Sequence, residues 1–135
     1  MTVIEELIAL LLAAPAVSAI AGTRIYPVSA PQGRTLPDAT VYQVSAQPVY
    51  CDEGAAGLTE ERYTVDCWGA TYTSAKGLAQ AVKATLSAYV GTPPGGTIAL
   101  AFVTIEDERD DRESGGNVAS YPFRTSLDFM VWSKQ

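Results

Sequence analysis

Apolar residues near the N-terminus recur in adjacent pairs at every fourth position, which is the spacing of one face of an α-helix. The stripe comprises Val3, Ile4, Leu7, Ile8, Leu11 and Leu12. It predicts a helix over residues 3–13 that packs on a core, with Glu5 and Glu6 off the stripe in the first turn. Pro15 then opens a second short helical segment, for which Gly22 provides a left-handed C-cap.

Two runs of alternating apolar and polar residues predict a long hairpin in the middle of the chain. The first covers residues 40–46 and follows a proline-rich loop that has only a brief extended piece at residues 24–26. The second covers residues 59–68, and a glycine-containing loop at residues 52–58 is expected to join the two. Its residues on the core side are Tyr63, Val65 and Cys67.

Between residues 74 and 90 the apolar period changes to 3.6 residues, which predicts a second main helix. Thr73 or Ser74 is suited to cap its N-terminus, and Gly91 is suited to end it. Gly77, near the start of this helix, costs about 1 kcal/mol relative to alanine. We attribute this glycine to a close approach between the helix and the sheet.

The last third of the chain predicts a second hairpin. Residues 97–105 are apolar on both faces, as in a central strand that is covered on both sides, and a charged loop then leads to an alternating run at residues 121–132. The inward residues of this run are Tyr121, Phe123, Leu127, Phe129 and Val131. The order helix, hairpin, helix, hairpin predicts one domain over residues 1–135. Its expected class is an α+β fold, a single mostly antiparallel β-sheet with two main helices packed on one face.

Composition narrows the class of function. The chain has 135 residues, of which 47% are hydrophobic and 18% are charged, values typical of one compact soluble domain. Its net charge is −6, and residues 106–113 hold six acids against Arg109 and Arg112, so four of those six charges lie in one segment. Basic residues elsewhere are scattered singly, which argues against a surface that grips nucleic acid.

The chain has no histidine, which removes the usual general base at neutral pH and the commonest zinc ligand. Cys51 and Cys67 do not have the spacing of a metal or redox motif, and we interpret both as free thiols. The apolar N-terminus carries acids where a signal peptide has basic residues, and Pro15 interrupts it. We therefore expect no enzyme active site, no cofactor, no metal and no membrane segment.

The charged segment, residues 105–117 with the sequence IEDERDDRESGGN, is the main candidate for chemistry. Arginines interrupt its acids, and its glycines come too late for an EF-hand calcium loop. The adjacent acids Asp110 and Asp111 lack the burial that separates the pKa values of a catalytic pair. Two interpretations remain: a solvated hairpin loop, or a segment whose acids and arginines pair with a neighbouring subunit.

Three stretches carry a resemblance to a known family: RIYPVSAPQGRTLPDATVYQVSAQP, GLTEERYTVDCWGATYTSAKGLAQAVKATL and ERDDRESGGNVASYPFRTSLDFMVW. In this order they resemble the tail-completion or tail-terminator family of long-tailed bacteriophages, prophages and gene transfer agents, over nearly the whole chain. The resemblance implies a structural virion protein without catalytic residues or cofactors. It also implies a six-membered ring at the head-proximal end of the tail tube, which stops tube polymerisation and connects the tail to the neck.

The resemblance further implies the partners and the location of the protein. The partners would be further copies of itself in a homohexamer, the tail tube protein and a neck or stopper protein, with DNA only passing through the channel. The location would be the tail or neck of the virion, after assembly in the bacterial cytoplasm. Two alternatives stay open: a head–tail joining or stopper protein of the same junction, and a small soluble ligand-binding or regulatory α+β module.

A cyclic ring joins two different patches of each subunit, head to tail. The other patch, opposite the charged segment, is expected to supply cations from Arg34 in the proline-rich loop, or from Arg62 and Arg124 on the polar face of the sheet. A second hypothesis is that acids of the charged segment, or of residues 51–54, face the channel and repel passing DNA. The residues assigned to the charged patch are Asp107, Glu108, Arg109, Asp110, Asp111, Arg112 and Glu113.

Overall fold

The computed structural model describes residues 3–29, 31, 35–51, 54–93, 100–112 and 122–134. Its helices and strands, in chain order, are α1 (Val3–Ala13), α2 (Pro15–Ala21), β1 (Ile25–Pro27), β2 (Asp38–Cys51), β3 (Gly54–Gly69), α3 (Tyr72–Leu86), β4 (Leu100–Arg112) and β5 (Phe123–Lys134).

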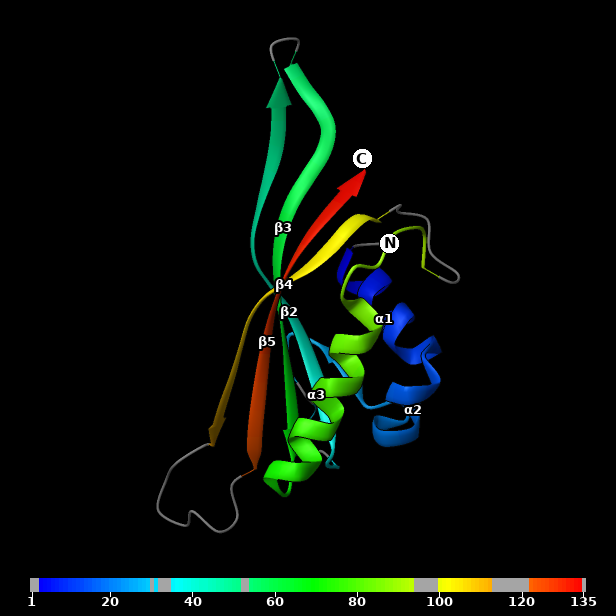
Figure 1. Ribbon diagram of the computed structural model, residues 1–135, viewed down its shortest axis with the longest axis vertical. Coiled ribbons are helices and arrows are strands. Elements are labelled where there is room, and N and C mark those ends of the chain that lie inside the picture. The colour runs from blue at the N-terminus through cyan, green and yellow to red at the C-terminus, as the bar shows by residue number, and fades with distance from the viewer. Residues whose placement is uncertain are drawn as a thin grey trace.

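The strands form one five-stranded sheet in the order β1-β2-β3-β5-β4. β1 and β2 are parallel, whereas every other neighbouring pair is antiparallel. The described helices pack on one face of this sheet and leave the other face without a helical layer (Figure 1). The predicted α+β fold, with a mostly antiparallel sheet and its main helices on one face, is confirmed.

Alternation along the two central strands builds the core as predicted. In the middle of β3 and β5, alternate side chains point toward the helices, and the apolar ones among them are at most 2% exposed. They join leucines and valines of α1 and α3 in one hydrophobic cluster. Burying one large aliphatic side chain contributes about 1.5–3 kcal/mol, so this cluster holds the helices on the sheet. The strand residues in it are Tyr63, Val65 and Cys67 of β3 and Leu127, Phe129 and Val131 of β5.

The helix boundaries match the predictions for α1 and α2 and differ for α3. α3 begins two residues earlier than predicted because Thr71 is the cap: its hydroxyl accepts a hydrogen bond from the backbone N–H of Ser74 at 3.1 Å. It ends at Leu86, before Gly91, and its capping residue is Ser87. The predicted caps Thr73 and Ser74 are therefore wrong, because both already lie inside the helix.

The close approach between α3 and the sheet occurs at Gly69, and not at Gly77 as predicted. A Cβ atom on Gly69 would lie 2.5 Å from the backbone nitrogen of Ala75. A Cβ atom on Gly77 would meet nothing within 4 Å. The last residue of β3 therefore lets the chain turn tightly into the helix, and Gly77 has no such packing role.

The β2–β3 hairpin is longer than its alternation predicted. Cys51 pairs with Gly54, so most of the predicted loop at residues 52–58 is strand, and Thr59 lies opposite Pro48. The hairpin extends past the end of the helical layer (Figure 1). Cys67 is a buried free thiol, as predicted.

β4 overturns two predictions. The charged residues 107–112 belong to this strand and pair with β5, whereas the sequence predicted a loop. The apolar part of the strand lies at the edge of the sheet, whereas its two apolar faces predicted a central strand. Backbone pairing with β5 and the ion pairs described below account for a strand in a segment whose acids are poor strand formers.

Candidate assembly surface

A bulge in β4 divides its charged side chains between the two faces of the sheet. The pairing register with β5 shifts between Ile105 and Asp107. Before the shift, Val103 and Ile105 contribute to the core cluster. After it, Glu108 pairs with the core residue Leu127 and points toward α3. Alternation then places Asp110 on the helix side and Asp107, Arg109 and Asp111 on the side without helices.

The two acids on the helix side are bound by lysines of α3. Glu108 accepts hydrogen bonds from the ammonium groups of Lys76 and Lys83, the latter at 2.8 Å. Asp110 lies 3.2 Å from the Lys76 nitrogen and accepts a hydrogen bond from the Thr125 hydroxyl at 2.8 Å. The hydrogen bonds from Lys76 and Lys83 hold the pKa of Glu108 below its usual value, although partial burial opposes them. These acids therefore fasten the edge strand to α3.

On the face without helices, the carboxylate of Asp128 is the centre of a polar network. One of its oxygens lies 2.8 Å from the Arg109 guanidinium, and the other accepts a hydrogen bond from the Thr64 hydroxyl at 2.7 Å. Burial raises the pKa of Asp128, but the hydrogen bonds from Arg109 and Thr64 outweigh it and leave the pKa below its usual value. Arg109 also contacts Asp107 at 3.1 Å, and Arg62 lies 4.0 Å from Asp128. The network spans β3, β5 and β4.

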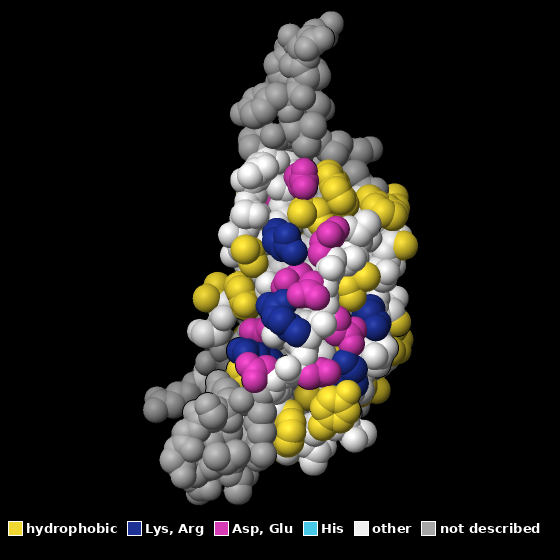
Figure 2. All heavy atoms as spheres, turned by 60° about the vertical axis from the view of Figure 1, so that its left-hand side comes forward, with side chains coloured by type: hydrophobic (Ala, Val, Ile, Leu, Met, Phe, Trp, Pro, Cys, Tyr) yellow, Lys and Arg dark blue, Asp and Glu magenta, His cyan; other side chains and the backbone are white. Residues whose placement is uncertain are grey.

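The charge pattern continues toward the end of the sheet where β4 ends. The guanidinium of Arg124 lies 2.7 Å from Asp111 and 5.4 Å from the centre of the Trp68 ring, over which it is stacked. In the view that brings the sheet side of the molecule forward, positive and negative side chains are interleaved over one surface (Figure 2). This surface therefore carries positive and negative charges side by side, and not charges of a single sign.

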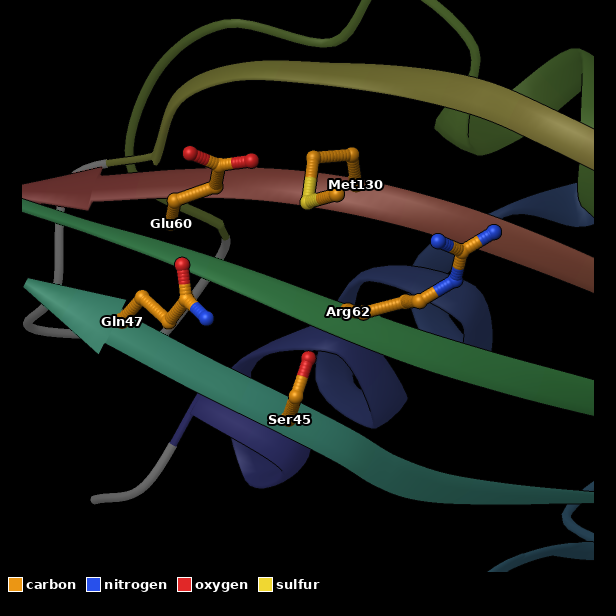
Figure 3. Close-up of a pocket in the computed structure, with 5 residues that line it drawn as sticks. All are labelled: Ser45, Gln47, Glu60, Arg62 and Met130. Carbon is orange, nitrogen blue, oxygen red and sulfur yellow. The ribbon is translucent and has the colours of Figure 1, made fainter.

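A shallow hollow lies on the same sheet face, beside the network. It has a volume of about 200 Å³ and is lined by Ser45, Gln47, Glu60, Arg62 and Met130. These side chains rise from β2, β3 and β5 with the helices behind the strands (Figure 3). Ligand pockets are mostly apolar and larger, about 300–1,000 Å³, so this hollow is better suited to a side chain of a partner than to a small molecule.

The family model for tail completion protein gp17 matches residues 5–134 of the chain. The chain belongs to this family. A chain in the virion of a native gene transfer agent particle has the same fold, with a TM-score of 0.72 and 18% sequence identity. The match covers 97% of this chain and 93% of that chain. No curated protein sequence matches. Membership of the tail completion family identifies a structural protein of a phage-like tail.

The predicted interface residues of this tail protein fall into three groups. Asp107, Arg109, Asp111, Arg62 and Arg124 come together on the sheet face without helices. Glu108 and Asp110 lie on the opposite side, against α3. Arg34 and Glu113 lie outside the described residues, and only the backbone of Arg112 is described.

Sequence reasoning missed the partners of these charges. Alternation along residues 121–132 places Asp128 on the outward face, and the helical period of residues 74–90 places Lys76 and Lys83 off the apolar stripe. Neither pattern says which acid meets which base, because the contacts join residues 19 to 34 positions apart. The signal that was present is alternation along β5, which puts Asp128 on the same face as Arg124.

The described residues also bear on metal and membrane sites. They contain no group of three or more Cys, Asp or Glu side chains placed to hold a metal ion. No single described helix has both the length and the hydropathy of a membrane span. α1 and α2 satisfy these criteria only as a pair, and they are bent by 88° relative to each other.

Proposed function

We propose that this protein forms a hexameric ring at the head-proximal end of a long phage-like tail, where it ends tube polymerisation and connects the tail to the neck. The observation that carries the proposal is the match to the tail completion family over residues 5–134. The likeness of the fold to a chain of a gene transfer agent virion over nearly its full length supports it. The partners would be further copies of the chain, the tail tube protein and a neck or stopper protein.

We assign the proposed contact between subunits to those residues of the charged patch that lie on the sheet face without helices. Glu108 and Asp110 already form ion pairs with lysines of their own chain, so we do not expect them to bind a neighbouring subunit. Asp107, Arg109 and Asp111 expose about half or more of their side chains, at 54%, 49% and 60%. Exposed carboxylates and guanidinium groups of both signs favour a partner with complementary signs and fix its register.

The experiment that tests the ring position is deletion of the gene, followed by negative-stain microscopy of the particles that form. The proposal predicts overlong tubes of irregular length without heads. Tails of normal length lying apart from filled heads would instead assign the protein to head–tail joining. Intact infectious particles would contradict both roles and favour a soluble ligand-binding module.

A second experiment tests the charged contact. Reversing Arg109 and Arg112 together (R109E/R112E) is expected to shift the purified protein from ring to monomer, as measured by light scattering after size-exclusion chromatography. Lys83→Glu is the matched control, because it reverses a charge of α3 that pairs with Glu108 on the opposite face of the sheet. Assembly that stays unchanged over a range of salt concentrations would refute the contact.

A further inference from the structure

We propose that neighbouring copies in the ring meet through two apolar patches that lie at opposite margins of the sheet. One is the β4–β5 patch, which consists of Phe102, Met130 and Trp132. The other is the β1–β2 patch, which consists of Val28 and Val44. The inference rests on the proposed ring and names the apolar centre of the contact between its subunits.

The β4–β5 patch lies on the sheet face without helices. Val131 of β5 belongs to the core, so its neighbours Met130 and Trp132 point to the opposite face, where Met130 is seen with the helices behind the strands (Figure 3). Phe102 pairs with Trp132 across the strands, and their rings lie 6.5 Å apart. Phe102 is 41% exposed, and the other two side chains are partly exposed. Aromatic residues and methionine are enriched in the buried centre of protein interfaces, so this patch has the composition of a contact surface.

The backbone of β4 at this margin is already paired within the chain. The N–H of Gly91 donates to the carbonyl of Leu100 at 2.9 Å, and the N–H of Leu100 donates to the carbonyl of Gly91 at 2.8 Å. The N–H of Ala88 donates to the carbonyl of Val103 at 2.8 Å. The segment after α3 therefore covers the outer side of the strand at these positions. A partner meets side chains of the β4–β5 patch there, and not an open strand edge.

The β1–β2 patch lies at the other margin of the sheet. The N–H of Val28 donates to the carbonyl of Val41 at 2.8 Å, which fixes Val28 beside β2. Val44 follows three residues later, where a register shift interrupts the pairing of β2 with β3. Val28 and Val44 are 66% and 54% exposed. Residues 25–29 and 39–47 carry no charge, so a second apolar surface can approach this margin without burying an ion.

The positions of the two patches suit two copies of the same chain. The pairing register places Ser45, Arg62 and Met130 in one row across the sheet. Val44 precedes Ser45, so it lies at the height of the β4–β5 patch. A rotation about an axis along the strands brings points of equal height together, and a head-to-tail ring joins two different patches. The β1–β2 patch of one copy can therefore meet the β4–β5 patch of the next.

The charged contact proposed above continues directly from the β4–β5 patch. Met130 pairs with Thr104, and the next pair on the same face is Asp128 with Asp107. Hydrophobic side chains lie beside the interleaved charges in Figure 2. An apolar centre with a charged rim is the usual anatomy of a contact between proteins. The apolar patches therefore supply the centre for which the charged residues form the rim.

A charge exchange tests whether the two patches meet. F102E and V44K should each lower the hexamer fraction by about tenfold or more at a concentration where the wild type is a ring, because a charge enters the apolar centre. The double variant F102E/V44K should recover most of the hexamer, because each contact then joins a carboxylate to an ammonium group. The matched controls are Tyr72→Glu and Leu12→Lys, whose residues are 49% and 38% exposed on α3 and α1. Circular dichroism and thermal melting check that all five variants fold.

Tryptophan fluorescence reads the β4–β5 patch in the wild type. Trp68 is only 7% exposed, so a change on assembly reports mainly on Trp132. Ring formation should shift the emission to shorter wavelengths and reduce quenching by acrylamide, because the neighbour covers the indole.

The outcomes separate this inference from the proposed function. A ring that forms without the fluorescence change, or single variants that assemble like the controls, would overturn the inference and leave the ring standing. A double variant that assembles no better than the single variants would overturn the pairing of the two patches. A fluorescence change that needs added tail tube protein would assign the β4–β5 patch to that protein instead. A wild type that never forms a ring, with or without tube protein, would refute the proposed function itself.

Discussion

The Arg109 guanidinium on β4 lies 2.8 Å from the Asp128 carboxylate on β5, and the second oxygen of that carboxylate accepts a hydrogen bond from Thr64 on β3. Three strands are thus tied together by side chains on a face that has no helical layer. Asp128 is 9% exposed even on this face, because the long side chains around it shield it. The network therefore orders the side chains on the sheet face without helices, although no apolar layer covers them.

Replacing Asp128 by alanine should destabilise the protein by about 1–3 kcal/mol, because Arg109 and Thr64 both lose a charge-assisted hydrogen bond. Urea unfolding followed by circular dichroism measures this change. Thr104→Ala serves as the control, since its hydroxyl bonds only to the exposed Glu106 among the contacts described. A loss no larger than that of the control would show that the network does not stabilise the fold.

Glu61 should make stability depend on pH in the opposite sense to Asp128. Burial raises the pKa of Glu61 above its usual value, despite a hydrogen bond from the Tyr63 hydroxyl. The stability that Glu61 contributes is therefore fully present below its pKa in the unfolded state, and it is lost as pH rises through its pKa in the folded state. Glu61→Gln should gain stability relative to wild type between pH 4.5 and neutral pH. Parallel stability curves for the two proteins over that range would contradict this.

Because the pKa of Asp128 is lowered, its contribution is present above the unfolded pKa and is lost as pH falls through the folded pKa. Acid unfolding of the wild type should therefore show a loss that D128N lacks. The pH range in which this loss of stability occurs lies below 3.8, the usual pKa of an aspartate. A D128N curve that falls in parallel with wild type in this range would exclude Asp128 as the source.

Glu108 and Lys83 should be energetically coupled. Their charged groups lie 2.8 Å apart, and the side chains are 24% and 33% exposed. A double-mutant cycle with E108A and K83A is expected to give about 0.5–1 kcal/mol of coupling, and added salt should reduce it. Coupling that is zero at low salt would show that the pair of Lys83 and Glu108 does not help to hold α3 to β4.

Gly69 and Gly77 form a matched pair for a backbone test. Gly69→Ala should destabilise the protein by about 1–3 kcal/mol, because its new methyl group would overlap the backbone of Ala75. Gly77→Ala should stabilise it by about 0.5–1 kcal/mol, since the site is open and alanine favours the helix. Thermal melts of both variants decide the question, and equal effects of the two changes would contradict the assigned close approach.

Cys67 should be inert in the folded protein. Its side chain is 0% exposed, and burial raises the pKa of its thiol well above the usual value. A cysteine-modifying reagent added to the native Cys51→Ser variant should therefore react with Cys67 only as fast as the protein unfolds. Rapid labelling under native conditions would indicate that the core under α3 opens readily.

The sequence by itself determined the elements whose evidence is local. Each of these elements can be predicted from the residues of a single segment. The evidence is the spacing of apolar residues in α1, the alternation of apolar and polar residues in β3 and β5, and the change of the apolar period at α3. The matching helices and core residues bear this out, and the fold class follows from their order. The resemblance to tail completion proteins was also carried by the sequence, since the motifs extend through most of the chain.

Only the tertiary structure decided what the charged segment is. Read locally, residues 107–112 have the composition of a loop, and residues 100–105 have the pattern of a buried strand. In the fold, β5 supplies a ladder of backbone hydrogen bonds, and a bulge turns two acids toward the lysines of α3. Arg109 and Arg124 pair with the other two acids, Asp107 and Asp111. These partners come from distant parts of the chain, so no local pattern records them. Whether a strand is central or at an edge depends in the same way on which strands remain to pair with it.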